Sequence, residues 1–248
     1  IMNNPAPKTV VLTGASRGIG HVTVGYFARR GWRVICCSRE APPPSCPRDP
    51  SLGIHIRADL SKPEDVESFI AQANEVLGDD PLHALVNNAG VSPKTPYKER
   101  LGCLNGDIDA WRDVFELNFF TPLTLARGFA SALHRGKGAI CNITSIAGHY
   151  VHPFAGSAYS TSKAALSGLT REMAVEFAEL GVRVNAVAPG EIKTDMISPE
   201  YEALVPRIPM NRMGTPEDVA AAVHYLVGED SSYVTGTEIF VTGGQHLY

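Results

Sequence analysis

Short apolar runs alternate along the chain with longer segments in which apolar and polar positions follow a helical period. Several of the short runs are continuously apolar, which is typical of strands that are covered on both faces. The runs predicted to be strands are Thr9–Thr13, Trp32–Cys37, Gly53–Ala58, Ala84–Asn87, Ala139–Thr144, Arg183–Ala188 and Glu238–Val241.

The segments between these runs predict helices with one apolar face. In Pro63–Leu77 the apolar residues recur at intervals of three and four, and Ser61 with Glu64 forms the pattern of a capping box. A later helix is predicted to begin after Thr215, which precedes a proline and two acids. Alternating strands and helices indicate one α/β domain, residues 1–248, with a seven-stranded parallel sheet and helices on both faces.

A glycine-rich turn connects the first strand to the first helix. In this turn the first glycine permits a tight bend, the second lets a pyrophosphate approach the backbone, and the third lets the helix pack closely on the strand. A helix N-terminus placed there offers free N–H groups to phosphates. The turn therefore predicts a Rossmann-type, doubly wound dinucleotide fold, with the cofactor held by Gly14, Ser16, Arg17, Gly18, Ile19 and Gly20.

The end of the second strand bears on the choice of cofactor. Enzymes that prefer NAD usually carry an acid there for the ribose 2′-hydroxyl, whereas this chain has Ser38 and Arg39. Two guanidiniums, Arg17 and Arg39, with the Ser38 hydroxyl, would suit a 2′-phosphate, so NADP(H) is favoured over NAD(H). The alternatives are that both arginines are solvated, or that Glu40 holds the ribose. Asp59 either meets the adenine edge or caps a helix.

Tyr159 and Lys163 lie four residues apart at the start of a predicted helix and therefore share one face. An ammonium ~4 Å from a phenol, at an effective dielectric constant of ~20, favours phenolate by about 4 kcal/mol, or ~3 pKa units. We expect this pair to bring the pKa of the Tyr159 phenol near the pH at which a general acid–base works best.

The whole chain, from about Lys8 to Gly244, resembles the short-chain dehydrogenase/reductase family, of the kind that includes 3-oxoacyl-ACP reductases and tropinone-type ketone reductases. The resemblance rests on motifs that follow one another in the family's order. They are the turn Thr13–Gly20, Asp59-Leu60, Asn87-Asn88-Ala89-Gly90, Asn118, Ser145, the Tyr159/Lys163 pair, and Pro189-Gly190 with Ile192 and Thr194.

This resemblance implies a role for each matched residue. Tyr159 would be the acid–base, Lys163 would lower its pKa and hold the nicotinamide ribose, and Ser145 would hydrogen-bond the substrate oxygen. Asn118 would anchor a water that links Lys163 to solvent. The remaining residues implied to contact the cofactor are Asp59, Leu60, Asn88, Ala89, Gly90, Pro189, Gly190, Ile192 and Thr194.

Three segments depart from the family pattern. Prolines between residues 41 and 50 exclude the helix usually found there. Thr242 replaces the aspartate of a Val-Asp-Gly-Gly sequence. The stretch Ser92–Asp109 is long and is expected to hang over the site entrance.

Two further segments are expected to shape the substrate pocket. These are Gly148–Phe154 and a substrate loop at about 190–213, whose mixture of aromatic and apolar residues predicts a moderately apolar substrate with Glu191 holding a polar group. His149 and His152 lack a third ligand, so no metal is predicted.

Composition and charge exclude some classes of partner and location. The chain of 248 residues has a formal charge of −4, which gives no reason to expect a nucleic-acid partner. It shows neither a signal-peptide pattern nor an apolar run long enough for a membrane span, and its five cysteines form no C-x-x-C pair. We therefore expect a cytoplasmic protein, and the resemblance implies a homo-oligomer, most often a tetramer.

Three functions are open at this point. The first is an NADP(H)-dependent oxidoreductase that interconverts a small carbonyl compound, acyl-thioesters included, and a secondary alcohol. The second is an NAD-dependent dehydrogenase of a sugar, polyol or hydroxy acid. The third is a non-catalytic dinucleotide-sensing regulator, because a fold does not fix a function.

Overall fold

The computed structural model describes residues 6–41, 53–194 and 199–247. Its centre is a sheet of seven parallel strands in the order β3-β2-β1-β4-β5-β6-β7. The strands are β1 (Thr9–Thr13), β2 (Arg33–Ser38), β3 (Gly53–Arg57), β4 (Ala84–Asn87), β5 (Ala139–Ile143), β6 (Arg183–Pro189) and β7 (Glu238–Val241). All seven predicted strands are confirmed, with ends shifted by at most one residue.

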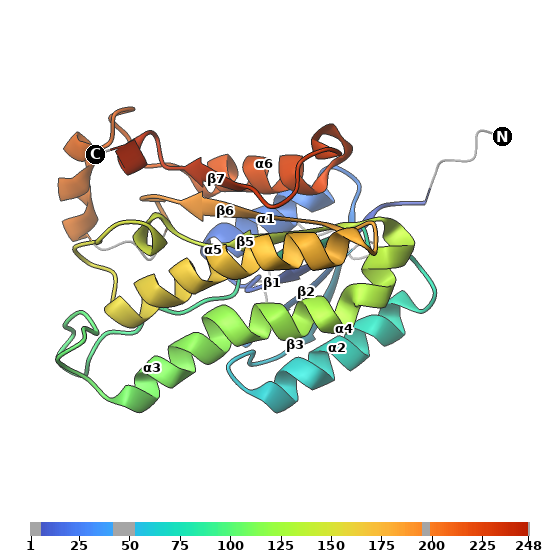
Figure 1. Ribbon diagram of the computed structural model, residues 1–248, viewed down its shortest axis with the longest axis horizontal. Coiled ribbons are helices and arrows are strands. Elements are labelled where there is room, and N and C mark those ends of the chain that lie inside the picture. The colour runs from blue at the N-terminus through green and yellow to red at the C-terminus, as the bar shows by residue number, and fades with distance from the viewer. Residues whose placement is uncertain (1–5, 42–52, 195–198, 248) are drawn as a thin grey trace.

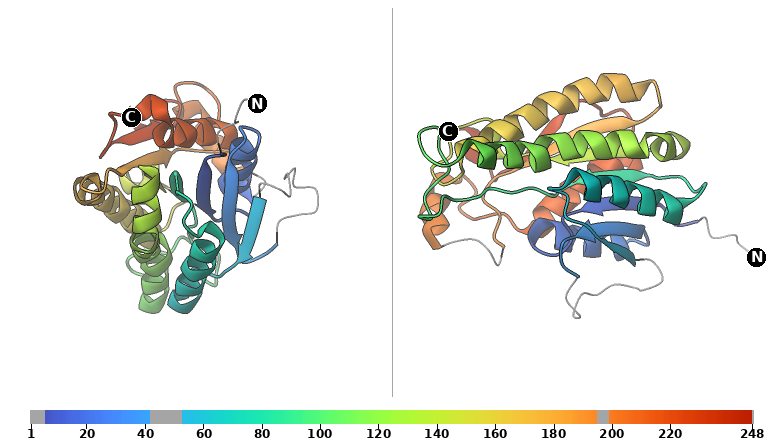
Figure 2. Two further views of the ribbon diagram at one scale, coloured as in Figure 1. Left: turned by 90° about the vertical axis from the view of Figure 1, so that its right-hand side faces the viewer. Right: turned by 90° about the horizontal axis from the view of Figure 1, so that it is seen from below.

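Helices cover both faces of this sheet, as predicted (Figures 1 and 2). Helices α1 and α6 pack together on one face, and α2, α4 and α5 lie on the other. Within the described residues the α-helices are α1 (Gly18–Ala28), α2 (Pro63–Leu77), α3 (Ile108–Phe115), α4 (Thr121–Gly136), α5 (Ser157–Ala178) and α6 (Pro216–Val227). Shorter turns of helix are η1 (Glu116–Phe120), η2 (Ile146–Gly148), η3 (Pro199–Arg207), η4 (Glu229–Ser231) and η5 (Gln245–Leu247).

The apolar runs are continuous because each strand feeds two cores. In β1, Val11 packs into the cluster under α2, α4 and α5, whereas Val10 and Leu12 pack into the cluster under α1 and α6. Phe69 and Phe129 meet edge to face in the first cluster, with ring centroids 6.1 Å apart. Removing either helical layer would expose the side chains on one face of the sheet. Each layer therefore stabilises the fold, because fully burying a large apolar side chain contributes about 2 kcal/mol.

The two predicted helix caps had different outcomes. Thr215 caps α6 in a complete capping box with Asp218, as expected. The cap predicted at Ser61 is wrong, because α2 starts after Lys62 without a side-chain cap. The Ser61 hydroxyl instead donates to the Asp59 carboxylate at 2.7 Å, so it is not available to the helix.

The sheet reverses its strand order between β1 and β4, and this point determines where a ligand can bind. Parallel strands direct their carboxyl ends to one edge, and the loops on either side of such a reversal diverge and leave a crevice. The loops after β1, β4, β5 and β6 all leave from this edge. These loops and the helices that follow them carry most of the predicted site residues.

Two loops that were predicted from the sequence are described only in part. Most of the proline-rich stretch 41–50 and part of the substrate loop, including Met196 and Ile197, lie outside the described residues. Among the helices that the structure describes, none has the length and apolar character that a membrane crossing requires.

Candidate active site

The glycine turn is built by contacts that leave no room for side chains. A Cβ added to Gly20 would lie 2.0 Å from the Gly14 carbonyl oxygen, and Gly14 itself has a φ of +73°. Asn88 follows β4 and donates through Nδ2 to the Thr13 and Gly14 carbonyls at 3.0 and 3.2 Å. Asn88 therefore fixes the shape of the turn, a role that the sequence motif did not suggest.

Thr13 ties the same two loops together from below. Its Oγ1 accepts the backbone N–H groups of Asn88 and Ala89, both at 3.1 Å. The hydroxyl is buried, so these two N–H groups depend on it for a partner.

The N-terminus of α1 has the properties that a pyrophosphate requires. Its N-cap, Arg17, makes no side-chain cap, and the first turn contains no acidic residue. The nearest atom to a Cβ placed on Gly18 would be 3.6 Å away, on Thr194, so the backbone is approachable there. Unpaired N–H groups, a positive helix end and open space above them fit the phosphates of a dinucleotide.

A cavity of about 410 Å³ continues from the glycine turn across the ends of β2 and β3. Its lining includes most residues expected on the adenosine side, and also Ala110, Asp113 and Val114 of α3, which were not predicted. A smaller cavity of about 270 Å³ adjoins it, between Arg17 and Arg39. The expected positions of Gly14, Ser16, Arg17, Ser38, Arg39, Asp59, Leu60, Asn88, Ala89 and Gly90 are thus brought together.

Two of these residues have contacts that modify the expectation. The Ser38 hydroxyl donates to the Glu40 carbonyl at 2.7 Å and also contacts His55 Nε2 at 2.7 Å. The hydroxyl hydrogen expected to reach a 2′-phosphate is therefore already used. Burial raises the pKa of Asp59, but hydrogen bonds from Ser61 and the charges of Arg39 and Lys62 outweigh it and hold that pKa below its ordinary value.

Tyr159, Ser145 and Lys163 meet at the carboxyl end of β5. Tyr159 lies in the first turn of α5 and its hydroxyl is hydrogen-bonded to Ser145. Lys163 is buried one turn later, and its Nζ donates to the Ile143 carbonyl at 2.7 Å. The predicted catalytic residues therefore converge beside Gly90, whose Cβ would lie 3.3 Å from Lys163 Nζ.

The prediction that Lys163 lowers the pKa of the Tyr159 phenol is wrong in this structure. Burial raises the pKa of Tyr159 above its ordinary value, and the Glu191 carboxylate raises it further, while the hydrogen bond from Ser145 opposes both. Lys163 Nζ lies 5.7 Å from the centroid of the tyrosine ring. Burial also lowers the pKa of Lys163 to about 8, so its own charge is weakly held.

Asn118 occupies the π-helical turn η1, between α3 and α4. Its Oδ1 accepts from Val91 N at 2.9 Å, and its Nδ2 donates to Val91 O and Ser162 Oγ, both at 3.0 Å. These bonds fasten the loop after β4 to α5. Because both Nδ2 hydrogens are used, a water could be held only by an acceptor of Asn118, its backbone carbonyl or the second lone pair of Oδ1.

The segment after β6 runs back across the glycine turn. Thr194 comes close to Gly18, and Ile192 forms a parallel bridge with Gly214. A Cβ on Gly190 would lie 2.8 Å from Gln245 Oε1, so glycine there admits the C-terminal segment. The structure thus places Pro189, Gly190, Ile192 and Thr194 along one side of the crevice, as expected.

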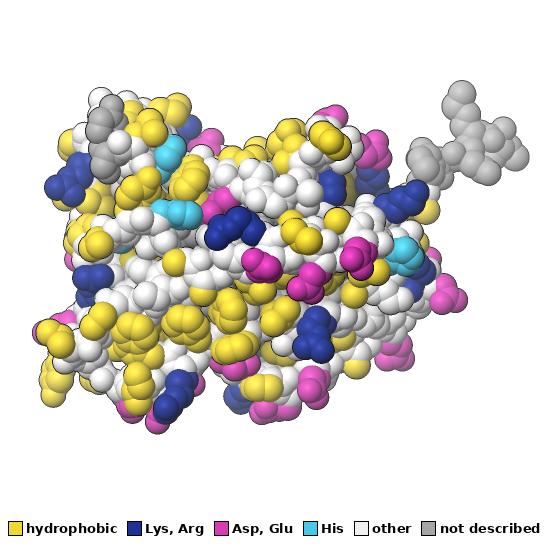
Figure 3. Space-filling view, in the orientation of Figure 1, with side chains coloured by type: hydrophobic (Ala, Val, Ile, Leu, Met, Phe, Trp, Pro, Cys, Tyr) yellow, Lys and Arg dark blue, Asp and Glu magenta, His cyan; other side chains and the backbone are white. Residues whose placement is uncertain are grey.

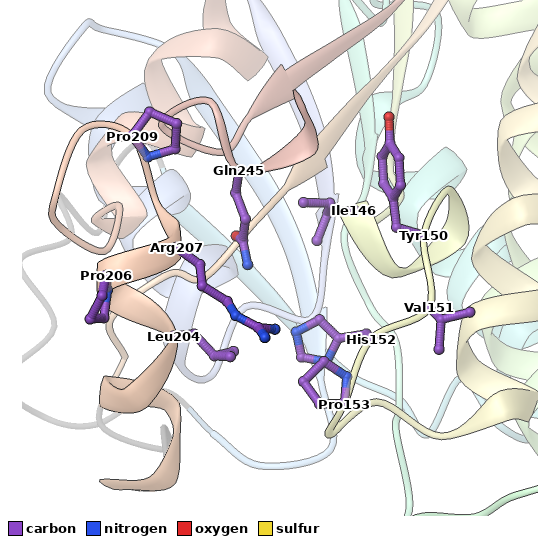
Figure 4. A pocket seen from close by; sticks show the side chains of 10 residues that line it. All are labelled: Ile146, Tyr150, Val151, His152, Pro153, Leu204, Pro206, Arg207, Pro209 and Gln245. Carbon is purple, nitrogen blue, oxygen red and sulfur yellow. The ribbon is translucent and has the colours of Figure 1, made fainter. Parts of the chain in front are cut away.

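A cavity of about 650 Å³ opens beyond Tyr159 and Ser145, between the turn after β5, η3 and the C-terminal segment (Figure 4). Its walls are mostly apolar, which agrees with the predicted substrate pocket. The lining residues are Ile146, Tyr150, Val151, His152, Pro153, Leu204, Pro206, Arg207, Pro209 and Gln245.

A buried polar network lies at the inner wall of this cavity. His152 Nδ1 accepts the backbone N–H groups of Phe154 and Ala155, so Nε2 carries the proton that is donated to Glu191 Oε1 at 2.6 Å. Gln245 Nε2 donates to the same oxygen at 3.2 Å. Sequence reasoning named His152 and Glu191 separately but gave no signal that they pair, and it missed Gln245.

The loop departures also have structural explanations. Thr242 Oγ1 contacts His246 Nδ1 at 2.7 Å, which gives the substituted position a partner of its own. The stretch 92–109 lies over the start of α5, where Leu101 O accepts from Ser157 N at 2.7 Å. In the described part of the chain, no three His, Cys, Asp or Glu side chains group as a metal site would need.

Comparison with known proteins identifies the family of the chain. The family profile described as "Enoyl-(Acyl carrier protein) reductase" matches residues 14–246. An oxidoreductase of Brucella ovis, described as a short chain dehydrogenase/reductase in complex with a partially ordered NAD, is 48% identical with a TM-score of 0.80, over 94% of this chain and 99% of that one. The chain belongs to the short-chain dehydrogenase/reductase family.

Two curated relatives show the range of this family around the chain. Protein FixR of Bradyrhizobium diazoefficiens is 51% identical over 97% of this chain and 87% of FixR. Galactitol 2-dehydrogenase (L-tagatose-forming) of Cereibacter sphaeroides is 37% identical over 96% of this chain and 94% of its own. This short-chain dehydrogenase/reductase is therefore an NAD(P)-dependent oxidoreductase that acts on an alcohol or carbonyl substrate.

Proposed function

We propose that this protein interconverts a carbonyl compound and a secondary alcohol with NADP(H), with Tyr159 as the acid–base. The observation that carries the proposal is the hydrogen bond between the side chains of Tyr159 and Ser145, next to Ile146 in the lining of the 650 Å³ cavity. One hydroxyl can donate a proton while the other orients the same substrate oxygen.

The residues divide the chemistry as follows. When bound, the nicotinamide supplies or accepts the hydride. Ser145 holds the substrate oxygen and shares its developing negative charge. Tyr159 gives its phenolic proton to that oxygen in reduction and takes it back in oxidation. Lys163, with one hydrogen bond to Ile143 O among the described residues, has N–H groups left for a ribose hydroxyl.

Burial keeps Tyr159 protonated, and this favours its role as the acid in reduction. Its raised pKa means that the phenol enters the reaction with its proton in place near neutral pH. Oxidation requires the phenolate, so we expect the oxidative reaction to demand a more alkaline medium than the reductive one. Substitution of Tyr159 by phenylalanine removes the proton and should lower kcat by about 100- to 10,000-fold. Unchanged turnover would disprove the mechanism.

The preference for NADP(H) is supported by Arg17 and Arg39 at the smaller cavity. Neither guanidinium has a hydrogen bond or ion pair within the described residues, and the space between them suits a phosphate. The test compares kcat/KM for NADPH and NADH in the wild type and in Arg39→Ala. We expect a selective loss with NADPH, whereas an equal loss with both cofactors would remove the assignment.

A dehydrogenase that uses NAD on a sugar, polyol or hydroxy acid is the second candidate. It is favoured by the NAD in the Brucella ovis relative and by the name of the galactitol dehydrogenase. The same comparison of cofactors separates the two candidates, when it is run with both a carbonyl and an alcohol panel. The protein would then be identified by the cofactor with the higher kcat/KM.

We also propose that the protein is one domain that acts in the cytoplasm as a homo-oligomer, with a tetramer expected. Apolar side chains gather over α4, α5 and the neighbouring turns, as Figure 3 shows. Phe120, which precedes α4, and Val175 of α5 are 47% and 74% exposed. Exposed apolar patches of this kind favour association. Light scattering of the purified protein measures the assembly directly, and a monomer would contradict the proposal.

A further inference from the structure

The substrate cavity contains a cation, Arg207, for which the described residues provide no counter-ion. Arg207 ends η3, and its side chain extends from that segment toward His152, across the cavity (Figure 4). In the chain as described, residues 6–41, 53–194 and 199–247, its guanidinium makes no hydrogen bond or ion pair. Its five N–H donors are therefore free to bind a ligand in the cavity.

The acid that contacts two residues of the cavity lining, Glu191, is already engaged. Glu191 is 4% exposed, and its Oε1 accepts from both His152 and Gln245. His152 is held in turn by two backbone N–H groups, so this network cannot swing toward Arg207 without losing buried hydrogen bonds. Arg207 and Glu191 are thus separate charges: Glu191 is hydrogen-bonded to its neighbours, whereas Arg207 makes no hydrogen bond or ion pair within the described residues.

We propose that the substrate of this enzyme carries a carboxylate, and that Arg207 binds it while Tyr159 and Ser145 act on a carbonyl or hydroxyl carbon elsewhere in the same molecule. The substrate class is then an oxo or hydroxy carboxylate. This inference rests on the proposed function, because it assigns the far end of the same substrate.

A carboxylate fits the cavity better than the other anions of metabolism. The planar guanidinium fork matches two carboxylate oxygens. A phosphate with nearly two charges would meet stronger repulsion from Glu191, which lies behind the lining residues His152 and Gln245. The remaining lining is apolar, from Ile146, Val151 and Leu204, which suits the carbon chain between the two polar ends.

The first test uses matched acids and esters. Levulinate and its next longer homologues are each compared with their methyl esters, with NADPH, in the wild type and in Arg207→Met. We expect the wild type to prefer at least one acid over its ester in kcat/KM, and the substitution to lower that ratio about 10- to 100-fold. Arg207→Lys should retain part of the preference, because it keeps the charge and loses the fork.

The control is Arg127→Met, which removes an exposed arginine of α4 that does not line the cavity. This variant should keep the ratio of acid to ester unchanged. A wild type that favours the esters at every chain length, or a ratio that Arg207→Met does not alter, would overturn the proposal.

A second measurement does not depend on turnover. The dissociation constants of the same acids and esters are measured by calorimetry on the protein loaded with NADP⁺. Tighter binding of an acid that is lost in Arg207→Met, without any reduction of it, would support the carboxylate site and count against the proposed function. Turnover of esters with no preference for acids in either measurement would do the reverse.

Discussion

The two halves of the crevice are built in different ways. The cofactor half depends on backbone atoms that pack too closely to admit a side chain at Gly20, and the Thr13 and Asn88 side chains hydrogen-bond this backbone over the ends of β1 and β4 at 3.0 to 3.2 Å. The substrate half is held by side chains, and His152, Glu191 and Gln245 come from segments that are far apart in the sequence. Contacts of the first kind admit few substitutions, whereas contacts of the second kind can be changed one side chain at a time.

This difference explains how one fold can serve many substrates. A change at the backbone of the cofactor half alters the turn itself, because a Cβ at Gly20 would overlap the chain. A change in the cavity lining alters only the ligand that fits there. The comparison predicts that substitutions in the cofactor half cost stability and cofactor affinity together, while those in the substrate half change specificity alone.

Gly20→Ala should have the largest effect. The added Cβ would lie 2.0 Å from Gly14 O and 2.4 Å from Asn88 Nδ2, so the turn or helix α1 must move. Overpacking of this kind costs about 3 kcal/mol, and the distorted turn should also bind NADPH poorly. Denaturant unfolding and a cofactor titration measure the two effects.

Gly168→Ala is the matched control, because Gly168 is also inside a helix. A Cβ there would meet nothing closer than Arg171 at 3.9 Å, so the substitution should stabilise by up to about 1 kcal/mol. Equal effects at Gly20 and Gly168 would show that the cofactor half is not sterically constrained.

Lys163 lies where the two halves meet, and its burial predicts a stability that rises with pH. Its pKa is lowered to about 8 in the folded protein from 10.5 in an exposed lysine. Between these values the unfolded chain binds a proton that the folded chain lacks, so the free energy of unfolding increases with pH. The slope is at most about 1.4 kcal/mol for each pH unit.

Lys163→Met removes this titration. The difference in unfolding free energy between wild type and variant should therefore shift in favour of the wild type from pH 8 to pH 10. Chemical denaturation at several pH values measures it. If the difference in unfolding free energy did not change with pH, Lys163 would be hydrated in solution and its ammonium would remain charged above pH 8.

The sequence was sufficient for what local patterns encode. Short apolar runs, several of them continuous, placed all seven strands, and the glycine turn placed the phosphate end, because both depend on neighbouring residues. The cap at Ser61 could not be predicted from its pattern, since Asp59 competes for the same hydroxyl.

Electrostatics and tertiary contacts were less accessible. The spacing of Tyr159 and Lys163 is helical, but the direction of the lysine is set by the Ile143 carbonyl at the end of β5. The charge on Glu191 acts on Tyr159 only because β6 brings them together. Arg207 and Gln245 carried no local signal at all, since their neighbours in the cavity come from distant parts of the chain.

Thr13→Val tests the cofactor half with a smaller change. Valine matches threonine in shape but cannot accept the N–H groups of Asn88 and Ala89, which would be left buried without a partner. We expect a loss of about 2 kcal/mol in the free energy of unfolding and a higher KM for NADPH. Thr124→Val, at an exposed position of α4, should change neither quantity measurably. A normal KM in Thr13→Val would separate the hydrogen bonds from cofactor binding.

Glu191→Gln should have the smallest effect on stability and the clearest effect on the substrate half. The amide oxygen of glutamine can still accept from His152 and Gln245, so the free energy of unfolding should change by less than about 1 kcal/mol. The negative charge that raises the pKa of Tyr159 is lost, and that pKa should fall. Because the reductive reaction needs the protonated phenol, the alkaline limb of its pH profile should move to lower pH, while the KM for NADPH stays unchanged. A profile that moves to higher pH, or a KM for NADPH that rises with it, would show that the two halves of the crevice are not independent.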